Sequence, residues 1–397
     1  MTILNQAPAT APATTTSPAD AVLSAGPARS TDTAETPRAR IERAKHAFST
    51  RSVGAFLRRA ADVDLITADH TPRAGEIVLA RVTSIGHHKR LEGPTSRRQV
   101  LFVGDEIVVA YGSRYAADQF LATVPADLGP AHLAAAGGLA SRVLEQHAGV
   151  GSPTEIEPIG VLRDEHGPLT LSRAAAHRIA PGVASRTDRP AHHAPVIAVL
   201  GTSMNSGKST VLAQLAHGLA AAGLRVAAGK ATGTGAGNDY NLFLDAGAHR
   251  VLDFTDFGYA STFQLGADEV RDLFLSMADE LAGGGAAPDV VLLEIADGLY
   301  QGETARLLGD AEFCRVVDEV VFSAGDALGA VGGVAALATL GHVPSFVSGV
   351  LTSSPLATAE SRRALEIPVV PTFDLADAGI ARGLVTELLR KHGADAA

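Results

Sequence analysis

The sequence predicts an α/β fold in which a parallel sheet is covered by helices on both faces. A smaller N-terminal domain with a β-barrel or β-sandwich module is predicted to precede it. From Val196 onward, short apolar segments alternate with helical patterns, which is typical of a parallel sheet buried on both faces. Between residues 75 and 124, short segments alternate apolar and polar side chains and are separated by turn residues.

The composition excludes several classes of protein. The 397 residues carry a net charge of −10, which argues against a protein that coats nucleic acid. Cys314 is the only cysteine, so neither an internal disulfide nor a cysteine metal cluster can form. The sequence has no apolar run long enough to span a membrane and no signal-peptide pattern at its N-terminus. We therefore expect a cytoplasmic protein without a membrane partner.

The first half of the chain divides by composition. Residues 1–36 are rich in Ala, Thr, Pro and Ser and are predicted to form a disordered tail. The N-terminal α+β domain, residues 37–180, begins with a basic helical pattern, continues with the β module near 75–124 and ends with a mostly helical pattern. The module has basic loops but few aromatic residues, so nucleic acid is not the expected partner. Residues 181–195 indicate a linker.

The second domain, residues 196–397, contains seven candidate strands separated by helical patterns. The strands are short and apolar, and each is followed by enough chain to return along the sheet as a helix. They are expected at 196–200, 225–229, 250–254, 289–293, 319–322, 346–351 and 367–370.

The loop after the first of these strands has the features of a phosphate-binding P-loop. Five residues separate Gly201 from Gly207-Lys208-Ser209, one more than usual, so Thr202 takes the place of the first glycine. Backbone N–H groups before a helix would still surround phosphate oxygens. Lys208 would reach the β- and γ-phosphates, and the Ser209 hydroxyl would bind Mg²⁺. The expected nucleotide-binding residues are Thr202, Ser203, Met204, Asn205, Ser206, Gly207, Lys208, Ser209 and Thr210.

Acidic residues follow other strands of the predicted sheet. Glu294 comes directly after the apolar run Val-Val-Leu-Leu, where a carboxylate needs a compensating cation. Asp253 and Asp256 follow another strand, and Asp239 lies in a glycine-rich loop. Because ligands bind at the carboxyl ends of such strands, we expect one aspartate to join Ser209 and Glu294 around Mg²⁺, and we favour Asp256. Helix capping is the alternative role for Asp253 and Asp256.

Three segments together resemble a known group of proteins. "GTSMNSGKST" resembles the P-loop of the dethiobiotin synthetase group, whose subclass also includes cobyrinic acid diamide synthase and the MinD-like ATPases. "GKATGTG" resembles the synthetase segment whose lysine assists phosphoryl chemistry, here Lys230, although Ala231 replaces a proline. "EIADG" resembles their acidic strand end, which implies that Glu294 binds metal, although Ala296-Asp297 interrupts the glycine pattern. The resemblance covers roughly residues 195–375.

The resemblance implies a function. ATP and Mg²⁺ would be the cofactors, Lys208, Lys230 and Glu294 the catalytic residues, and a small molecule the substrate that is phosphorylated or activated by a ligase or kinase. It also implies a homodimer. Two alternatives remain: a nucleotide-dependent switch or metallochaperone-like NTPase that acts on a protein partner, and a binding module with little turnover. The sequence lacks an Asn-Lys-x-Asp guanine signature, and it leaves ATP and GTP open.

Overall fold

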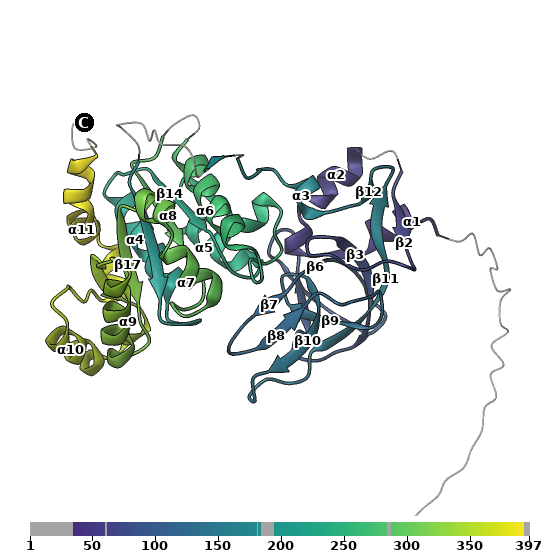
Figure 1. Cartoon of the computed structure of the whole chain (residues 1–397), viewed down its shortest axis with the longest axis horizontal. Helices are drawn as coiled ribbons and strands as arrows, with labels where there is room; N and C mark the ends of the chain where they lie inside the picture. The colour runs from purple at the N-terminus through teal and green to yellow at the C-terminus, as the bar shows by residue number, and fades with distance from the viewer. Residues whose placement is uncertain (1–34, 60–61, 181, 184–193, 284–286, 393–397) are drawn as a thin grey trace, which may run out of the picture. The chain divides into compact units, whose positions relative to one another are not determined.

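The computed structural model describes residues 35–59, 62–180, 182–183, 194–283 and 287–392 (Figure 1). The chain from Pro37 onward forms one compact unit. The predicted tail, residues 1–36, and the predicted linker, residues 181–195, lie for the most part outside the described residues.

The first region, residues 37–180, is built mainly of antiparallel strands. β3 (Ile77–Ser84) lies between β6 (Glu106–Tyr111) and β11 (Thr154–Asp164). β10 (Leu139–Gln146) pairs with both β9 (Ala131–Ala135) and β6. Because β11 also pairs with β9, the strand pairings return to their starting point and enclose a core between them.

Short elements complete the first region. The basic segment that begins the region forms two short helices. The strands are β1 (Lys45–His46), β2 (Asp64–Ile66), β4 (Arg90–Glu92), β5 (Arg98–Val100), β7 (Arg114–Tyr115), β8 (Phe120–Thr123) and β12 (Gly167–Pro168). Most of these short strands pair within the large sheet, whereas β4 and β5 form a separate two-stranded sheet. The helices are α1 (Pro37–Arg43), α2 (Val53–Arg59), α3 (Leu171–Ala174) and the 3₁₀ turn Phe48–Thr50.

The segment from 126 to 180 differs from its predicted, mostly helical structure. It contributes the strands β9, β10 and β11. Its alanines favour a helix in isolation, but here they are buried against neighbouring strands, where small side chains fit. Gly138 lies in the turn between β9 and β10 and has a φ of +101°, which is incompatible with a continuous helix through this segment.

The second region contains a six-stranded parallel sheet in the order β15-β14-β16-β13-β17-β18. Six of the seven predicted strands are present: β13 (Val196–Gly201), β14 (Val226–Lys230), β15 (Arg250–Asp253), β16 (Val290–Glu294), β17 (Glu319–Ser323) and β18 (Phe346–Ser348). The seventh, at 367–370, makes only an isolated bridge between Val369 and Val347. Pro368 and Pro371 flank that bridge and cannot donate to a strand ladder.

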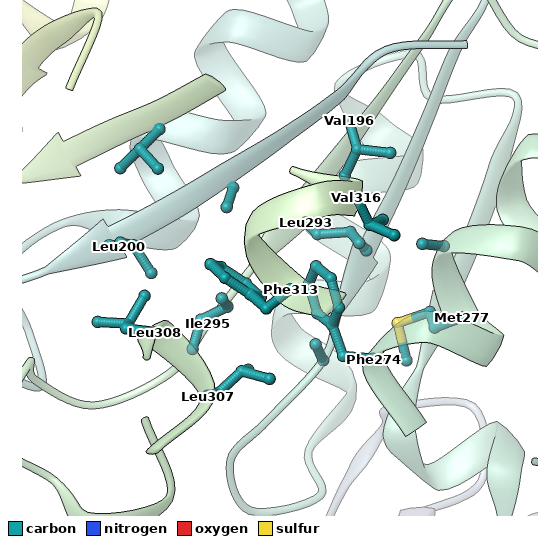
Figure 2. Close-up of a cluster of buried hydrophobic side chains, with 14 of the residues drawn as sticks. Val196, Leu200, Phe274, Met277, Leu293, Ile295, Leu307, Leu308, Phe313 and Val316 are labelled. Atoms are coloured by element: carbon teal, nitrogen blue, oxygen red, sulfur yellow. The ribbon is translucent and has the colours of Figure 1, made fainter. Parts of the chain in front are cut away.

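Helices cover both faces of the parallel sheet (Figure 1). One face packs on α6 to α9, and Figure 2 shows Phe274 of α6 beside Phe313 of α8, with ring centroids 4.9 Å apart. The other face packs on α4, α5 and α11. The helices are α4 (Lys208–Ala221), α5 (Gly237–Asp245), α6 (Ala267–Ala282), α7 (Gly302–Leu308), α8 (Ala311–Val316), α9 (Ala327–Thr339), α10 (Pro355–Ala364), α11 (Ala378–Lys391) and the 3₁₀ turns Phe254–Phe257, Val350–Ser353 and Thr372–Ala376.

In the described part of the chain, no helix combines the length and the apolar character that crossing a lipid bilayer requires.

Candidate nucleotide-binding site

The loop between β13 and α4 folds closely over the first turn of the helix. Gly207 precedes α4 with a φ of +99°, a conformation that glycine adopts without strain. Gly201 is the last residue of β13 and pairs with Ser323, so the early glycine still belongs to the strand. A Cβ on Gly201 would lie 2.3 Å from Ser206 Oγ. The unusual spacing therefore leaves a tight turn in which Gly201 is sterically required.

Lys208 is buried at the first position of α4 and is 6% exposed. Its Nζ donates to the backbone oxygens of Ser203, at 2.8 Å, and Asp297, at 3.0 Å. Burial lowers the pKa of Lys208, while Glu294 partly opposes the change. These carbonyls hold the ammonium group between the loops that follow β13 and β16.

Two buried polar atoms beside Lys208 have no hydrogen-bond partner among the described residues. They are Ser206 Oγ and Glu294 Oε2. Glu294 is 1% exposed, at the end of β16, and an unpartnered carboxylate oxygen in such a place costs free energy. The site thus offers an oxygen that a bound cation or hydrogen-bond donor would satisfy, which fits a Mg²⁺ ion with a phosphate ligand.

Lys230, at the end of β14, connects two carboxylates. Its Nζ lies 3.3 Å from Glu294 Oε1 and forms a short ion pair with Asp239 in the first turn of α5. Burial opposes the charge of Lys230, but the two carboxylates outweigh burial and raise its pKa. Burial favours a raised pKa for Asp239. The charge of Lys230 and a hydrogen bond from Ser209 outweigh burial and hold the pKa of Asp239 below its usual value. Lys230 therefore favours the ionised form of Asp239 beside Ser209.

A cavity of about 530 Å³ opens over these residues, which is within the usual size of a small-ligand site. Residues of β14, β16 and the P-loop line one side. Arg114 and Tyr115 of β7, in the first region, line another. Both halves of the chain therefore contribute to one cavity.

Most residues that the sequence predicted for the P-loop reach this cavity. Met204, Asn205, Gly207, Lys208, Ser209 and Thr210 line it, as do Lys230 and Glu294. Thr202, Ser203 and Ser206 do not line it but shape the loop: Thr202 N donates to Ser323 O, Ser203 O binds Lys208, and Ser206 O accepts from Ser323 Oγ at 2.7 Å.

The structure places Asp256 away from the residues that line the cavity. Its carboxylate accepts hydrogen bonds from Arg51 at 2.5 Å and from the backbone N of Asp253 at 2.9 Å. Asp253 in turn caps the following 3₁₀ turn. Two strands, β14 and β16, separate β15 from the P-loop strand, and neither Asp253 nor Asp256 lines the cavity. The geometry favours Asp239 as the aspartate beside Ser209.

The structure adds Arg114, for which the sequence had no signal because it lies in a two-residue strand without a motif. Asp297 follows Glu294 in a polar loop that the sequence indicated, and its backbone oxygen accepts from Lys208. Among the described residues, no group of three His, Cys, Asp or Glu side chains is arranged to hold a metal ion. A Mg²⁺ ion here would rely on the Ser209 hydroxyl, a carboxylate and phosphate oxygens.

Comparison with known proteins gives structural matches alone. No family model matches the chain, and no curated protein matches its sequence. The signal recognition particle receptor FtsY from Elizabethkingia anophelis, in complex with GDP, is 16% identical with a TM-score of 0.31, over 51% of this chain and 69% of that chain. FtsY from Mycoplasma mycoides is 16% identical with a TM-score of 0.32, over 54% and 74%. The 54 kDa signal recognition particle protein from Aeropyrum pernix K1, in complex with GDP, is 20% identical with a TM-score of 0.32, over 56% and 52%.

These matches correct one expectation. The sequence analysis expected a small-molecule substrate as the partner, and this was wrong: the similar structures are a receptor and a protein of the signal recognition particle. Two of the three are structures in complex with GDP. The TM-scores are low, and the functional argument therefore rests on the site itself.

Proposed function

We propose that this protein is a nucleotide-dependent switch that binds and hydrolyses a nucleoside triphosphate and acts on a protein partner. One observation carries the proposal: the P-loop and the β7 strand of the other region face the same cavity. A nucleotide in that cavity would contact both regions at once. Nucleotide binding could thereby change the conformation of the first region, which has no catalytic motif of its own.

The residues of the site divide the work. The amides of the P-loop and Lys208 would bind the phosphates, and Ser209 with Glu294 or Asp239 would hold Mg²⁺. A bound Mg²⁺ stabilises negative charge on the phosphate oxygens. Lys230 is engaged by two carboxylates, so we assign it a positioning role rather than contact with the nucleotide.

A second connection runs from the cavity to the first region. The cavity is lined by Gly233 and Thr234, which lie between β14 and α5, and by Asp239 in the first turn of α5. In the same segment, Gly237 N donates to Glu92 Oε1 at 3.0 Å, and Asn241 Nδ2 donates to Ser96 Oγ at 2.7 Å. A change in this segment on nucleotide binding would therefore act on the β4–β5 hairpin.

Calorimetry with GTP, GDP, ATP and ADP, each with Mg²⁺, tests nucleotide binding. The wild-type protein is expected to bind at least one triphosphate, and Lys208→Ala is expected to weaken this binding on the order of 100-fold, because a buried charged contact to phosphate is lost. Lys391→Ala, on the exposed end of α11, is the matched control and should leave binding unchanged. A wild-type protein that binds none of the four nucleotides contradicts the proposal.

Hydrogen exchange tests the switch separately from binding. Protection of residues 86–104 should differ between the complex with a non-hydrolysable triphosphate and the complex with the diphosphate. Equal protection in both complexes would leave a nucleotide-binding protein but reject the switch.

A further inference from the structure

Arg114 is a buried cation that is 7% exposed. Its guanidinium forms no ion pair with a carboxylate among the described residues, although the charges of Asp118 and Asp297 act on it. Nη1 donates to the backbone oxygen of Ala134, Nη2 donates to Gln119 Oε1 at 2.9 Å, and Nε is buried without a partner. A buried charge in this state is costly unless a ligand compensates it.

Arg114 lines the same cavity as Lys208, although the two residues belong to different regions of the chain. A P-loop lysine reaches the β- and γ-phosphates, and Lys208 Nζ donates to the backbone oxygen of Asp297. The charges of the Asp118 and Asp297 side chains both act on Arg114. A nucleotide whose outer phosphates contact Lys208 would therefore lie in a cavity that Arg114 also lines.

The hairpin that carries Arg114 contacts the P-loop directly. Asp118, in the turn between β7 and β8, accepts a hydrogen bond from Asn205 Nδ2 at 2.7 Å. Asn205 has a φ of +59°, so the P-loop holds a left-handed residue at this contact. The same turn supplies Gln119, which orients the Arg114 guanidinium. The position of Arg114 is thus tied to the conformation of the P-loop.

We propose that Arg114 binds the terminal phosphate of the nucleotide, so that the first region distinguishes a triphosphate from a diphosphate. This inference rests on the proposed function, because it requires a nucleotide in the cavity. The guanidinium offers Nε and a second N–H group in a planar fork, which suits phosphate oxygens. A diphosphate would leave Arg114 without its ligand and release the hairpin from that contact.

The test compares affinities for a non-hydrolysable triphosphate analogue and for the diphosphate of the same base. R114Q is expected to weaken triphosphate binding by about 10-fold to 100-fold, the worth of a charge-assisted contact, and to change diphosphate binding by less than about 2-fold. R114K keeps the charge and should retain part of the triphosphate preference. R142Q removes an exposed arginine of β10 and serves as the matched control, with both affinities unchanged.

The outcomes separate this inference from the proposed function. A wild-type protein that binds no nucleotide rejects both. If the wild type binds nucleotide but R114Q loses triphosphate and diphosphate affinity equally, or loses neither, Arg114 does not read the terminal phosphate. Thermal melting identifies a variant that fails to fold. In that case R114K carries the test, and an unchanged triphosphate preference in R114K overturns the inference.

Discussion

The two regions that meet at the cavity differ in how their charges are satisfied. In the P-loop region, Lys230 is paired with Asp239 and Glu294, and Lys208 is held by two carbonyl oxygens. In the β region, Arg114 reaches the same cavity without a carboxylate partner among the described residues. The comparison indicates that the charged residues of the P-loop region are already paired with one another. In the β region, the charge of Arg114 would be balanced only by a bound anion.

The regions also differ in how their strands find each other. The parallel sheet joins each strand to the next through a helix, so the pattern is visible along the sequence. The β region pairs distant segments: Ser84 of β3 lies opposite Glu155 of β11. Arg51 joins the two regions, since it forms ion pairs with Asp253 and Asp256.

The largest expected effect on stability comes from removing the ion pairs of Arg51 with Asp253 and Asp256. Arg51→Ala should lower the free energy of unfolding by about 3 kcal/mol, because it leaves two partly buried carboxylates without their cation. Burial raises the pKa of Asp253, and the loss of Arg51 would make this carboxyl take up a proton more readily. Urea denaturation measures the loss, and Arg58→Ala on the exposed side of α2 is the control. An effect as small as that of the control would show that the regions do not stabilise each other through Arg51.

The second prediction concerns Gly349, a glycine of the P-loop region that lies beside the P-loop itself. Gly349 has a φ of +104°, and a Cβ there would lie 2.4 Å from Ser323 Oγ and 2.6 Å from Ser206 O. Gly349→Ala should therefore cost about 3 kcal/mol in unfolding free energy and also weaken nucleotide binding. Gly341 has a φ of +82° but open space around it, so Gly341→Ala should cost about 1 kcal/mol and spare binding. Equal losses would mean that the P-loop tolerates displacement.

Lys230 tests whether the preassembled charges serve chemistry. Lys230→Ala should reduce nucleotide turnover on the order of 100-fold, since the acids beside Ser209 lose the cation that positions them. Nucleotide affinity should change by less than about 3-fold, because Lys208 and the loop amides remain. Steady-state hydrolysis and calorimetry on the same preparation separate the two quantities. Unchanged turnover would remove Lys230 from the mechanism.

The effect that is smallest at neutral pH is a pH dependence in the β region. Burial, aided by the Arg114 charge, lowers the pKa of His88 from 6.5 to about 4. Between these values the unfolded chain binds the proton and the folded chain does not, so stability is complete above about pH 6.5 and declines toward pH 4. Replacing His88 by Gln should remove about 3 kcal/mol of this decline at about pH 4 and below, and almost none of the stability at about pH 7. The exposed His166→Gln is the control, and identical pH profiles for the wild type and His88→Gln would contradict the assignment.

Much of the P-loop region could be predicted because its signals are local. Six of seven strands follow from short apolar runs, and the residues around Lys208 follow from one loop. The choice of Asp256 was not supported, since strand order decides which aspartate lies beside Ser209, and order in a sheet is not visible in periodicity. The helical prediction for 126–180 failed because strand pairing in the β region outweighs the helix propensity of alanine.

The sequence by itself determined the parallel sheet and the glycine-containing loop between β13 and α4, and it predicted a cation near Glu294. Each depends on neighbours within a few residues: a strand, a turn, a helix start. Only the tertiary structure decided that β7 lines the cavity, that Asp239 rather than Asp256 lies beside Ser209, and that Arg114 forms no ion pair with a carboxylate in the described part of the chain. These facts depend on which distant segments of the chain lie next to each other. Such neighbours set the burial and the charge environment of each ionisable side chain, and no local sequence pattern encodes them.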